Sequence, residues 1–222
     1  MPSTVSIETE LNPAYACLTT TDPNFDQISI CKRSQAYIAF AKKDAKTIMK
    51  ITDLDKRALL LLDNINCFHV AGIYEEALHA AMIGSSRYTP EAWYELLSWC
   101  DIDKLRATGD ALPTKPITVY RGVVRYDDIE NYIKWEEFVI AQSWTRNKHI
   151  ASWFANWNCK RSNNPPSRAL VYSTKVNPEN IILCTNDRLE EEVVIDKESM
   201  SNFKLLKKTP VPFHPNEDNI SW

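Results

Sequence analysis

The segment ITVYRGVV (117–124) divides the sequence into a helical part and a β-rich part. Its valines, isoleucine, threonine and tyrosine are residue types typical of a strand. Ahead of it, 54–65 (LDKRALLLLDNI) and 71–82 (AGIYEEALHAAM) place apolar residues at helical spacing. Behind it, β-rich segments alternate with turn residues. The sequence therefore predicts an α+β fold.

The helical part carries further signals for helix starts. Thr52, followed three residues later by Asp55, resembles a capping box at the start of the helix at 54–65. The segment TPE at 89–91 combines a threonine N-cap, a proline at the first helical position and an acidic first turn. We therefore expect another helix to begin there and to continue to about residue 100.

One helix is expected within the β-rich part, at 148–157 (KHIASWFANW), where apolar residues recur at helical spacing. A parallel βαβ array would need a helix after nearly every strand, so we expect mainly antiparallel pairing. The expected strands are 117–124, 137–144, 169–176, 181–184 and 191–196, with further pairing at 203–206 and 211–213. We expect one domain over 1–222, with a helical subdomain (1–106), a β-rich core (107–213) and a tail (214–222).

Composition limits the possible function classes. The chain has 222 residues, 44% of them hydrophobic and 25% charged, which excludes collagen-like, coiled-coil and fully disordered proteins. A net charge of -3 provides no global positive field for nucleic acid or anionic membranes. No apolar run reaches the roughly 20 residues of a membrane span, and MPSTVSIETE (1–10) lacks the features of a signal peptide. We expect a cytoplasmic protein with no membrane partner.

Cysteine and glycine spacing argue against two kinds of site. The six cysteines form no C-x-x-C pair and no Cys-His zinc spacing, so we expect free thiols and no metal site. The four glycines are too far apart for the G-x-G-x-x-G or P-loop fingerprints. A nucleotide site built on a glycine-rich turn is therefore not expected.

Three features could carry chemistry. Arg121, in the middle of a predicted strand, could hold a phosphate or carboxylate, although an isolated arginine more often faces solvent. Ser143 and Thr145 are two apart on an extended chain and share one face, where they could orient a ligand or simply satisfy a strand end. Glu190 and Glu192 would likewise share a strand face, as paired acids do in glycoside chemistry, unless they belong to a solvated acidic run.

Taken in this order, these features resemble the Arg-Ser-Glu class of mono-ADP-ribosyltransferases. The likeness covers 119–195 and includes V-Y-R-G, then S-W-T followed by a helix, a V-Y strand with an N-P-E-N-I turn, and E-E-E-V-V-I. The family's middle motif is usually Ser-Thr-Ser, whereas Trp144 stands at its centre here, and strand alternation should point Trp144 away from the site. The resemblance implies a helical N-terminal part followed by two packed, mainly antiparallel sheets that form an NAD cleft. Compact phage-encoded and bacterial effector members are similar in size and plan, which would place the protein in the host cytoplasm if a phage encodes it.

The resemblance also implies roles for individual residues. Arg121 would grip NAD, Ser143 would position Glu192, and Glu192 would stabilise the positive charge formed as nicotinamide leaves. Glu190 would orient or deprotonate the acceptor. The other expected positions are Gly122, Thr145 and Phe154 for NAD, with core packing as the alternative for Phe154, and Asn186, Asp187 and Arg188 as an acceptor-recognition loop.

The function implied is therefore that of an enzyme that transfers ADP-ribose from NAD, as substrate, to an acceptor, without a metal. The E-x-E arrangement is associated in the family with arginine acceptors on proteins. Three alternatives remain open: an NAD glycohydrolase, transfer to nucleic acid, and an inactive binding module of the same fold.

Overall fold

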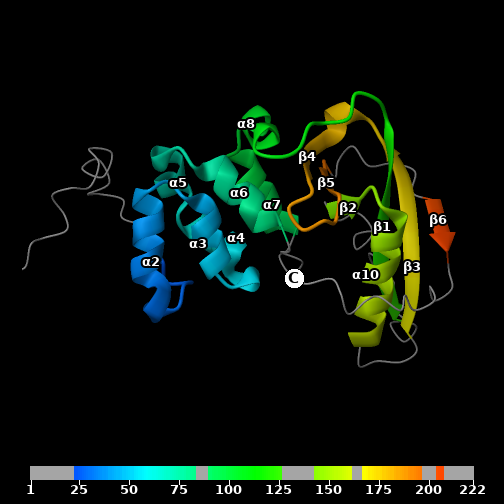
Figure 1. Ribbon diagram of the computed structural model, residues 1–222, viewed down its shortest axis with the longest axis horizontal. Coiled ribbons are helices and arrows are strands. Elements are labelled where there is room, and N and C mark those ends of the chain that lie inside the picture. The colour runs from blue at the N-terminus through cyan, green and yellow to red at the C-terminus, as the bar shows by residue number, and fades with distance from the viewer. Residues whose placement is uncertain (1–22, 84–89, 127–142, 162–166, 197–203, 208–222) are drawn as a thin grey trace, which may run out of the picture. The chain divides into compact units, whose positions relative to one another are not determined.

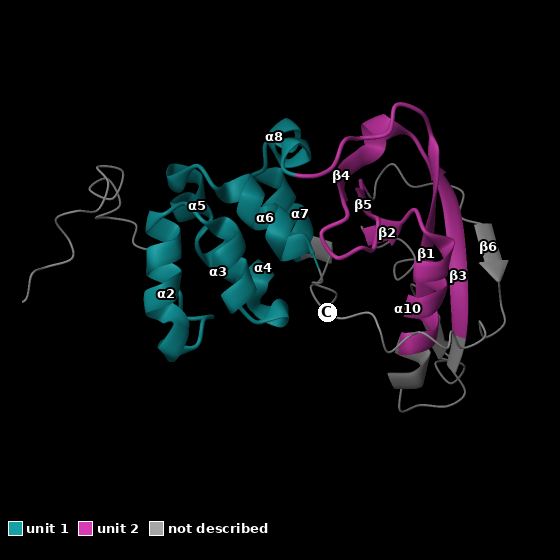
Figure 2. Ribbon diagram, viewed as in Figure 1, with its two compact units in different colours: residues 1–108 teal, residues 109–222 magenta. Residues whose placement is uncertain are grey.

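The computed structural model describes residues 23–83, 90–126, 143–161, 167–196 and 204–207. The chain forms two compact units, a helical unit (1–108) and a sheet unit (109–222), shown in teal and magenta in Figure 2. The boundary lies two residues beyond the one predicted after residue 106. Each unit is described by itself.

The described part of the helical unit is built from helices joined by short turns (Figure 1). In α6, Tyr74, Ala77, Leu78 and Ala81 are buried at a spacing of three and four residues, which gives the helix one apolar face. Helices α3 and α4 pack against α6. The helices are α2 (Ile30–Ala41), α3 (Ala45–Ile51), η3 (Leu54–Lys56), α4 (Arg57–Asp63), α5 (Ile65–Ala71), α6 (Tyr74–Met82), α7 (Pro90–Ser98) and α8 (Ile102–Ala107).

The predicted helix at 54–65 is divided in the structure. It starts as the short helix η3 and ends at Asn64, because the Asn64 side chain bonds to a distant part of the backbone. Its Nδ2 donates to the carbonyl oxygens of Asn24 and Leu60, both at 2.8 Å, and its Oδ1 accepts from the Asn24 N–H. The predicted capping box is wrong, since the Thr52 hydroxyl donates to the Ile48 carbonyl at the end of α3, at 2.7 Å.

The predicted helix at 71–82 begins at Tyr74 instead. Gly72 adopts a left-handed conformation, with φ of 70°, and ends α5, so the chain turns before α6 starts. Helix α7 begins at Pro90 as predicted, whereas Thr89 lies outside the described residues.

The sheet unit contains an antiparallel sheet of six described strands, with one face covered by α10 (Figure 1). Every pairing between the described strands is antiparallel, and the mixture of helices with this sheet confirms the α+β prediction. The order is β4-β5-β2-β1-β3-β6. The elements are β1 (Ile117–Tyr126), β2 (Ser143–Thr145), α10 (Lys148–Arg161), β3 (Ser167–Val176), η4 (Pro178–Asn180), β4 (Ile181–Thr185), β5 (Glu192–Ile195) and β6 (Lys204–Lys207). Predicted strand residues 137–142 and 211–213 and the tail at 214–222 lie outside the described residues.

Two separate sheets were predicted, whereas the described strands are connected in one. Strand β2 is only three residues long, and it pairs with β1 through a single register pair, Tyr120 with Thr145. By contrast, β1 and β3 pair along ten residues. The sheet therefore consists of two three-stranded halves, β4-β5-β2 and β1-β3-β6, joined by one narrow contact.

Gly122 explains how α10 lies so close to β1. A Cβ atom at Gly122 would stand 1.9 Å from the Ala151 carbonyl oxygen and 2.7 Å from the Ala155 nitrogen. The helix backbone therefore fills the space of a side chain.

The described residues contain no helix long and apolar enough to cross a membrane. Within the same ranges, no three His, Cys, Asp or Glu side chains are grouped so that they could hold a metal ion. Four of the six cysteines, Cys31, Cys67, Cys100 and Cys184, are described and are free thiols.

Candidate functional site

Arg121 lies on the longest strand pairing of the sheet unit, which fixes its position firmly. Opposite it on β3 stands Tyr172. The Arg121 guanidinium donates from Nη1 to the main-chain carbonyl oxygen of Ser143, and so links β1 to β2 beside their single register pair. Loss of water contact lowers the pKa of Arg121 to about 10, while the Glu192 charge acts in the opposite direction. Arg121 therefore stays positively charged at neutral pH.

Ser143 and Glu192 meet across the pairing of β2 with β5. Thr145 is opposite Glu192 and Ser143 is opposite Val194, so Ser143 and Glu192 are diagonal neighbours on one face. The Ser143 hydroxyl donates to Glu192 Oε1 at 2.5 Å. Only 8% of Glu192 is exposed. A buried carboxylate is thus held in one orientation by a short hydrogen bond.

The Glu192 carboxyl has a strongly shifted pKa. Burial, as the largest effect, raises the pKa from 4.5 to about 7. The Ser143 hydrogen bond lowers it, the neighbouring Glu190 raises it, and the charges of Arg188 and Arg121 lower it. The group can therefore change charge near neutral pH.

Glu190 is close to Glu192 but does not lie on the same strand, which corrects the sequence-based expectation. Strand β5 starts at Glu192, and the preceding Leu189 and Glu191 have φ of 58° and 48°. These left-handed residues end the extended alternation on which the expectation was based. A turn, rather than a strand face, places the two carboxylates near each other.

The Glu190 carboxyl is poorly satisfied. Its Oε1 atom is buried and accepts no hydrogen bond, although Arg188 Nη2 lies 3.4 Å away as an ion-pair partner. Burial raises the pKa of Glu190, and the positive charge of Arg188 opposes that shift. A buried acceptor without a donor is suited to receiving one from a bound molecule.

The Thr145 side chain supports the turn at 189–191 that carries Glu190. Its hydroxyl donates to the main-chain carbonyl of Glu190 at 2.6 Å and accepts from the Asn147 N–H at 3.0 Å. Only 6% of the residue is exposed. The hydroxyl hydrogen is therefore not available to a ligand, and Thr145 positions Glu190. Trp144 lies in the core with 2% exposure, directed away from Ser143 and Thr145.

Two asparagines reinforce the turn, and sequence reasoning missed this role for both. Asn147 Nδ2 donates to Glu191 Oε1 at 3.3 Å, and its Oδ1 accepts from the His149 N–H at the start of α10. Asn186, predicted to recognise the acceptor, accepts the Glu191 N–H on its Oδ1 at 3.1 Å. An asparagine directly before a predicted helix is a typical N-cap, and that signal could have identified Asn147.

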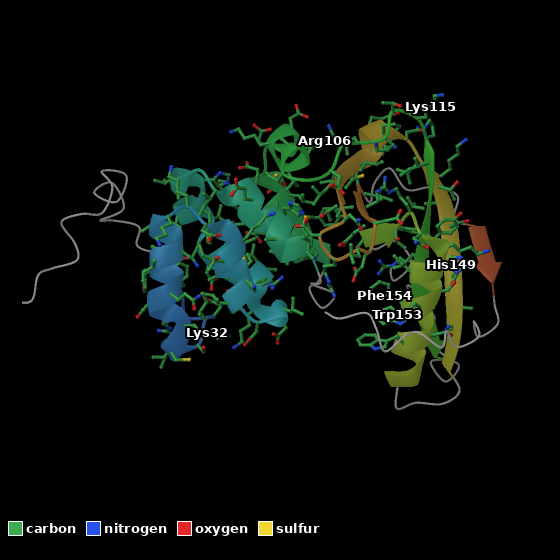
Figure 3. All side chains as sticks on the ribbon, in the orientation of Figure 1. Lys32, Arg106, Lys115, His149, Trp153 and Phe154 are labelled. Carbon is green, nitrogen blue, oxygen red and sulfur yellow. The ribbon has the colours of Figure 1, made fainter. Side chains whose placement is uncertain are left out.

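The remaining predicted residues lie in different surroundings. Gly122 lies against the backbone of α10, which leaves no room for a side chain at this position. Phe154, labelled in Figure 3, is a half-buried residue of α10 whose ring packs edge-on against Trp153 at 4.9 Å. The Asp187 N–H donates to the Thr185 hydroxyl at 3.2 Å, which holds the start of the turn to the end of β4.

Comparisons with known proteins add no relative: no family model matches the chain, and no curated protein or solved structure matches it.

Proposed function

We propose that this protein transfers ADP-ribose from NAD to an arginine side chain of an acceptor protein, with release of nicotinamide. The observation that carries the proposal is the buried Glu192 carboxylate, held by Ser143 and placed in the field of Arg121. The three residues come from three different strands, β1, β2 and β5, so the fold, not the local sequence, assembles the group.

Glu192 suits the step in which nicotinamide leaves. Cleavage of the glycosidic bond builds positive charge on the ribose, and a fixed carboxylate stabilises that charge best where water is largely excluded. Glu192 is buried, and the Ser143 hydrogen bond fixes its orientation. It needs no reorientation when the charge develops.

Arg121 suits the anionic part of the substrate. Its pKa of about 10 keeps it charged at neutral pH, and a guanidinium matches the geometry of phosphate oxygens. Its bond to the Ser143 carbonyl ties its position to the strand that carries the Ser143 hydroxyl. Strand β2 would thus position both Arg121, which binds the phosphates, and Ser143, which orients Glu192 for cleavage of the glycosidic bond.

Glu190 suits an arginine acceptor. A carboxylate pairs with a guanidinium, and the Glu190 Oε1 atom accepts no hydrogen bond from the protein. Its raised pKa makes it a better proton acceptor than an ordinary glutamate. Glu190 would orient the acceptor and take up the proton released on transfer.

The test is transfer of label from NAD in a cell lysate, with wild-type protein and Glu192→Gln compared. The protein and nucleic-acid fractions are counted separately, and released nicotinamide is measured. We expect labelled proteins with the wild type only. Label on nucleic acid would contradict the acceptor class, and nicotinamide release without label would identify a glycohydrolase. Neither product, or equal labelling by Glu192→Gln, would contradict the proposed function.

A further inference from the structure

We propose that Arg188 is a specificity-determining residue. Its guanidinium occupies the position beside Glu190 that the acceptor guanidinium would take. An acceptor arginine must then displace Arg188 before transfer. This inference rests on the proposed function, because it concerns the acceptor side of the same site. It assigns to Arg188 a competing role, where the sequence suggested only a recognition loop.

The contact between the two side chains supports the inference. Arg188 Nη2 lies 3.4 Å from Glu190 Oε1, and the side chains are 29% and 15% exposed. The same Oε1 atom is buried and accepts no hydrogen bond. Arg188 therefore neutralises the carboxylate at a distance without satisfying its oxygen. A guanidinium that donates directly to Oε1 would make a better partner.

The shape of the turn brings this pair together. Arg188 and Glu190 stand on either side of Leu189, which has a left-handed conformation, and the next residue, Glu191, is left-handed as well. The turn is held by bonds that do not involve the Arg188 side chain: Leu189 N–H to the Asn186 carbonyl, Glu191 N–H to Asn186 Oδ1, and the Thr145 hydroxyl to the Glu190 carbonyl. Replacement of Arg188 should therefore leave Glu190 in place.

The partial exposure of Arg188 makes displacement feasible. A partly exposed ion pair is weak, whereas a bidentate guanidinium–carboxylate pair is among the stronger charged contacts. Removal of the internal competitor should lower the KM for a guanidine acceptor by roughly threefold to tenfold. The KM for NAD should change less, because Arg188 forms its ion pair with Glu190 and its charge is only one of several smaller influences on Glu192.

The experiment uses the full chain, NAD and the small guanidine agmatine as acceptor, with steady-state KM and kcat measured for both substrates. Arg188→Gln removes the charge, Arg188→Lys retains it, and Lys175→Gln removes an exposed charge on β3 as a matched control. We expect a lower KM for agmatine in Arg188→Gln alone. An unchanged or higher KM in Arg188→Gln, or the same decrease in Lys175→Gln, would overturn the inference while the proposed function stands. No transfer to agmatine by the wild type would overturn the arginine acceptor and this inference together.

Discussion

The helical unit and the sheet unit both bury polar side chains, but the buried groups differ in charge and in partners. Asn64 in the helical unit is 3% exposed and neutral, and its amide bonds to the backbone at Asn24 and Leu60. Glu192 in the sheet unit is 8% exposed and ionisable, and its pKa is raised to about 7 by burial. A satisfied amide stabilises a fold, whereas a buried carboxyl with a raised pKa lowers stability when it ionises. Asn64 is thus a polar group with a structural role, whereas Glu192 is the group to which the proposed function assigns the chemistry.

The largest expected effect tests how each unit uses a glycine. Gly122→Ala should destabilise the sheet unit by at least about 3 kcal/mol, because the new Cβ would collide with the α10 backbone. Gly72→Ala, with no atom within 4 Å of the new Cβ, should cost only about 1 kcal/mol for its left-handed φ. Hydrogen exchange resolved by peptide measures each unit separately. Equal losses of stability in Gly122→Ala and Gly72→Ala would contradict the close packing of α10 on β1.

Asn64→Ala should have the next largest effect. It removes three hydrogen bonds to the backbone and leaves buried groups at Asn24 and Leu60 without that partner, so we expect a loss of about 2 to 3 kcal/mol. The measurement is urea unfolding followed by exchange in α4 and α5. Asp55→Ala, at an exposed position of η3, is the control and should change stability far less. If Asn64→Ala left the free energy of unfolding unchanged, the structural role of Asn64 would be contradicted.

Glu192→Gln should act in the opposite direction to Asn64→Ala. The folded-state pKa of about 7 lies above the ordinary 4.5, so the protonated carboxyl favours folding. That contribution is fully present below about pH 4.5 and is lost as pH rises through about 7. Glutamine is neutral throughout, so the variant should exceed the wild type in stability by on the order of 2 kcal/mol at pH 8 and match it at pH 4. Unfolding curves at both pH values test this, and a variant that is less stable at pH 8 would contradict it.

Thr145→Val should give the smallest of these changes. It preserves shape but removes the hydroxyl that bonds to the Glu190 carbonyl and the Asn147 N–H, so we expect a loss of about 1 to 2 kcal/mol. Amide exchange should also become faster at Asn147 and Glu191. Thr118→Val, at an exposed position on β1, is the control. If both variants exchange alike, the turn does not depend on Thr145.

Much of the fold followed from local patterns. Local sequence patterns, namely alternation, helical spacing and turn residues, were sufficient to predict three strands and one helix. These are the strands at 117–124, 169–176 and 181–184 and the helix at 148–157. The break at Asn64 was not, since it depends on a bond to Asn24, 40 residues away. The single connected sheet was also missed, because one register pair at Tyr120 decides it.

The same distinction applies to the candidate site. Ser143, Glu192 and Arg121 were selected from residue type and order, and the structure brings them together. The turn at 189–191 was not predictable, because leucine and glutamate rarely adopt a positive φ and are held there by partners from distant segments, such as Thr145. Long-range bonds therefore set the geometry of Glu190, while local pattern set that of the strands around it.

The most direct test of the account is the rate of nicotinamide release from NAD between about pH 5 and about pH 9. Catalysis through the Glu192 carboxylate requires its deprotonated form, so the wild-type rate should rise with pH through about 7 and then level off. Above about pH 7, Glu192→Gln should be slower than the wild type by at least roughly a hundredfold, and the difference should narrow towards about pH 5, where the wild-type carboxyl is mostly protonated. Glu179→Gln, which alters an exposed glutamate of η4, should keep the wild-type profile. A profile without the rise near pH 7, or a Glu192→Gln variant that releases nicotinamide at the wild-type rate, would contradict the account.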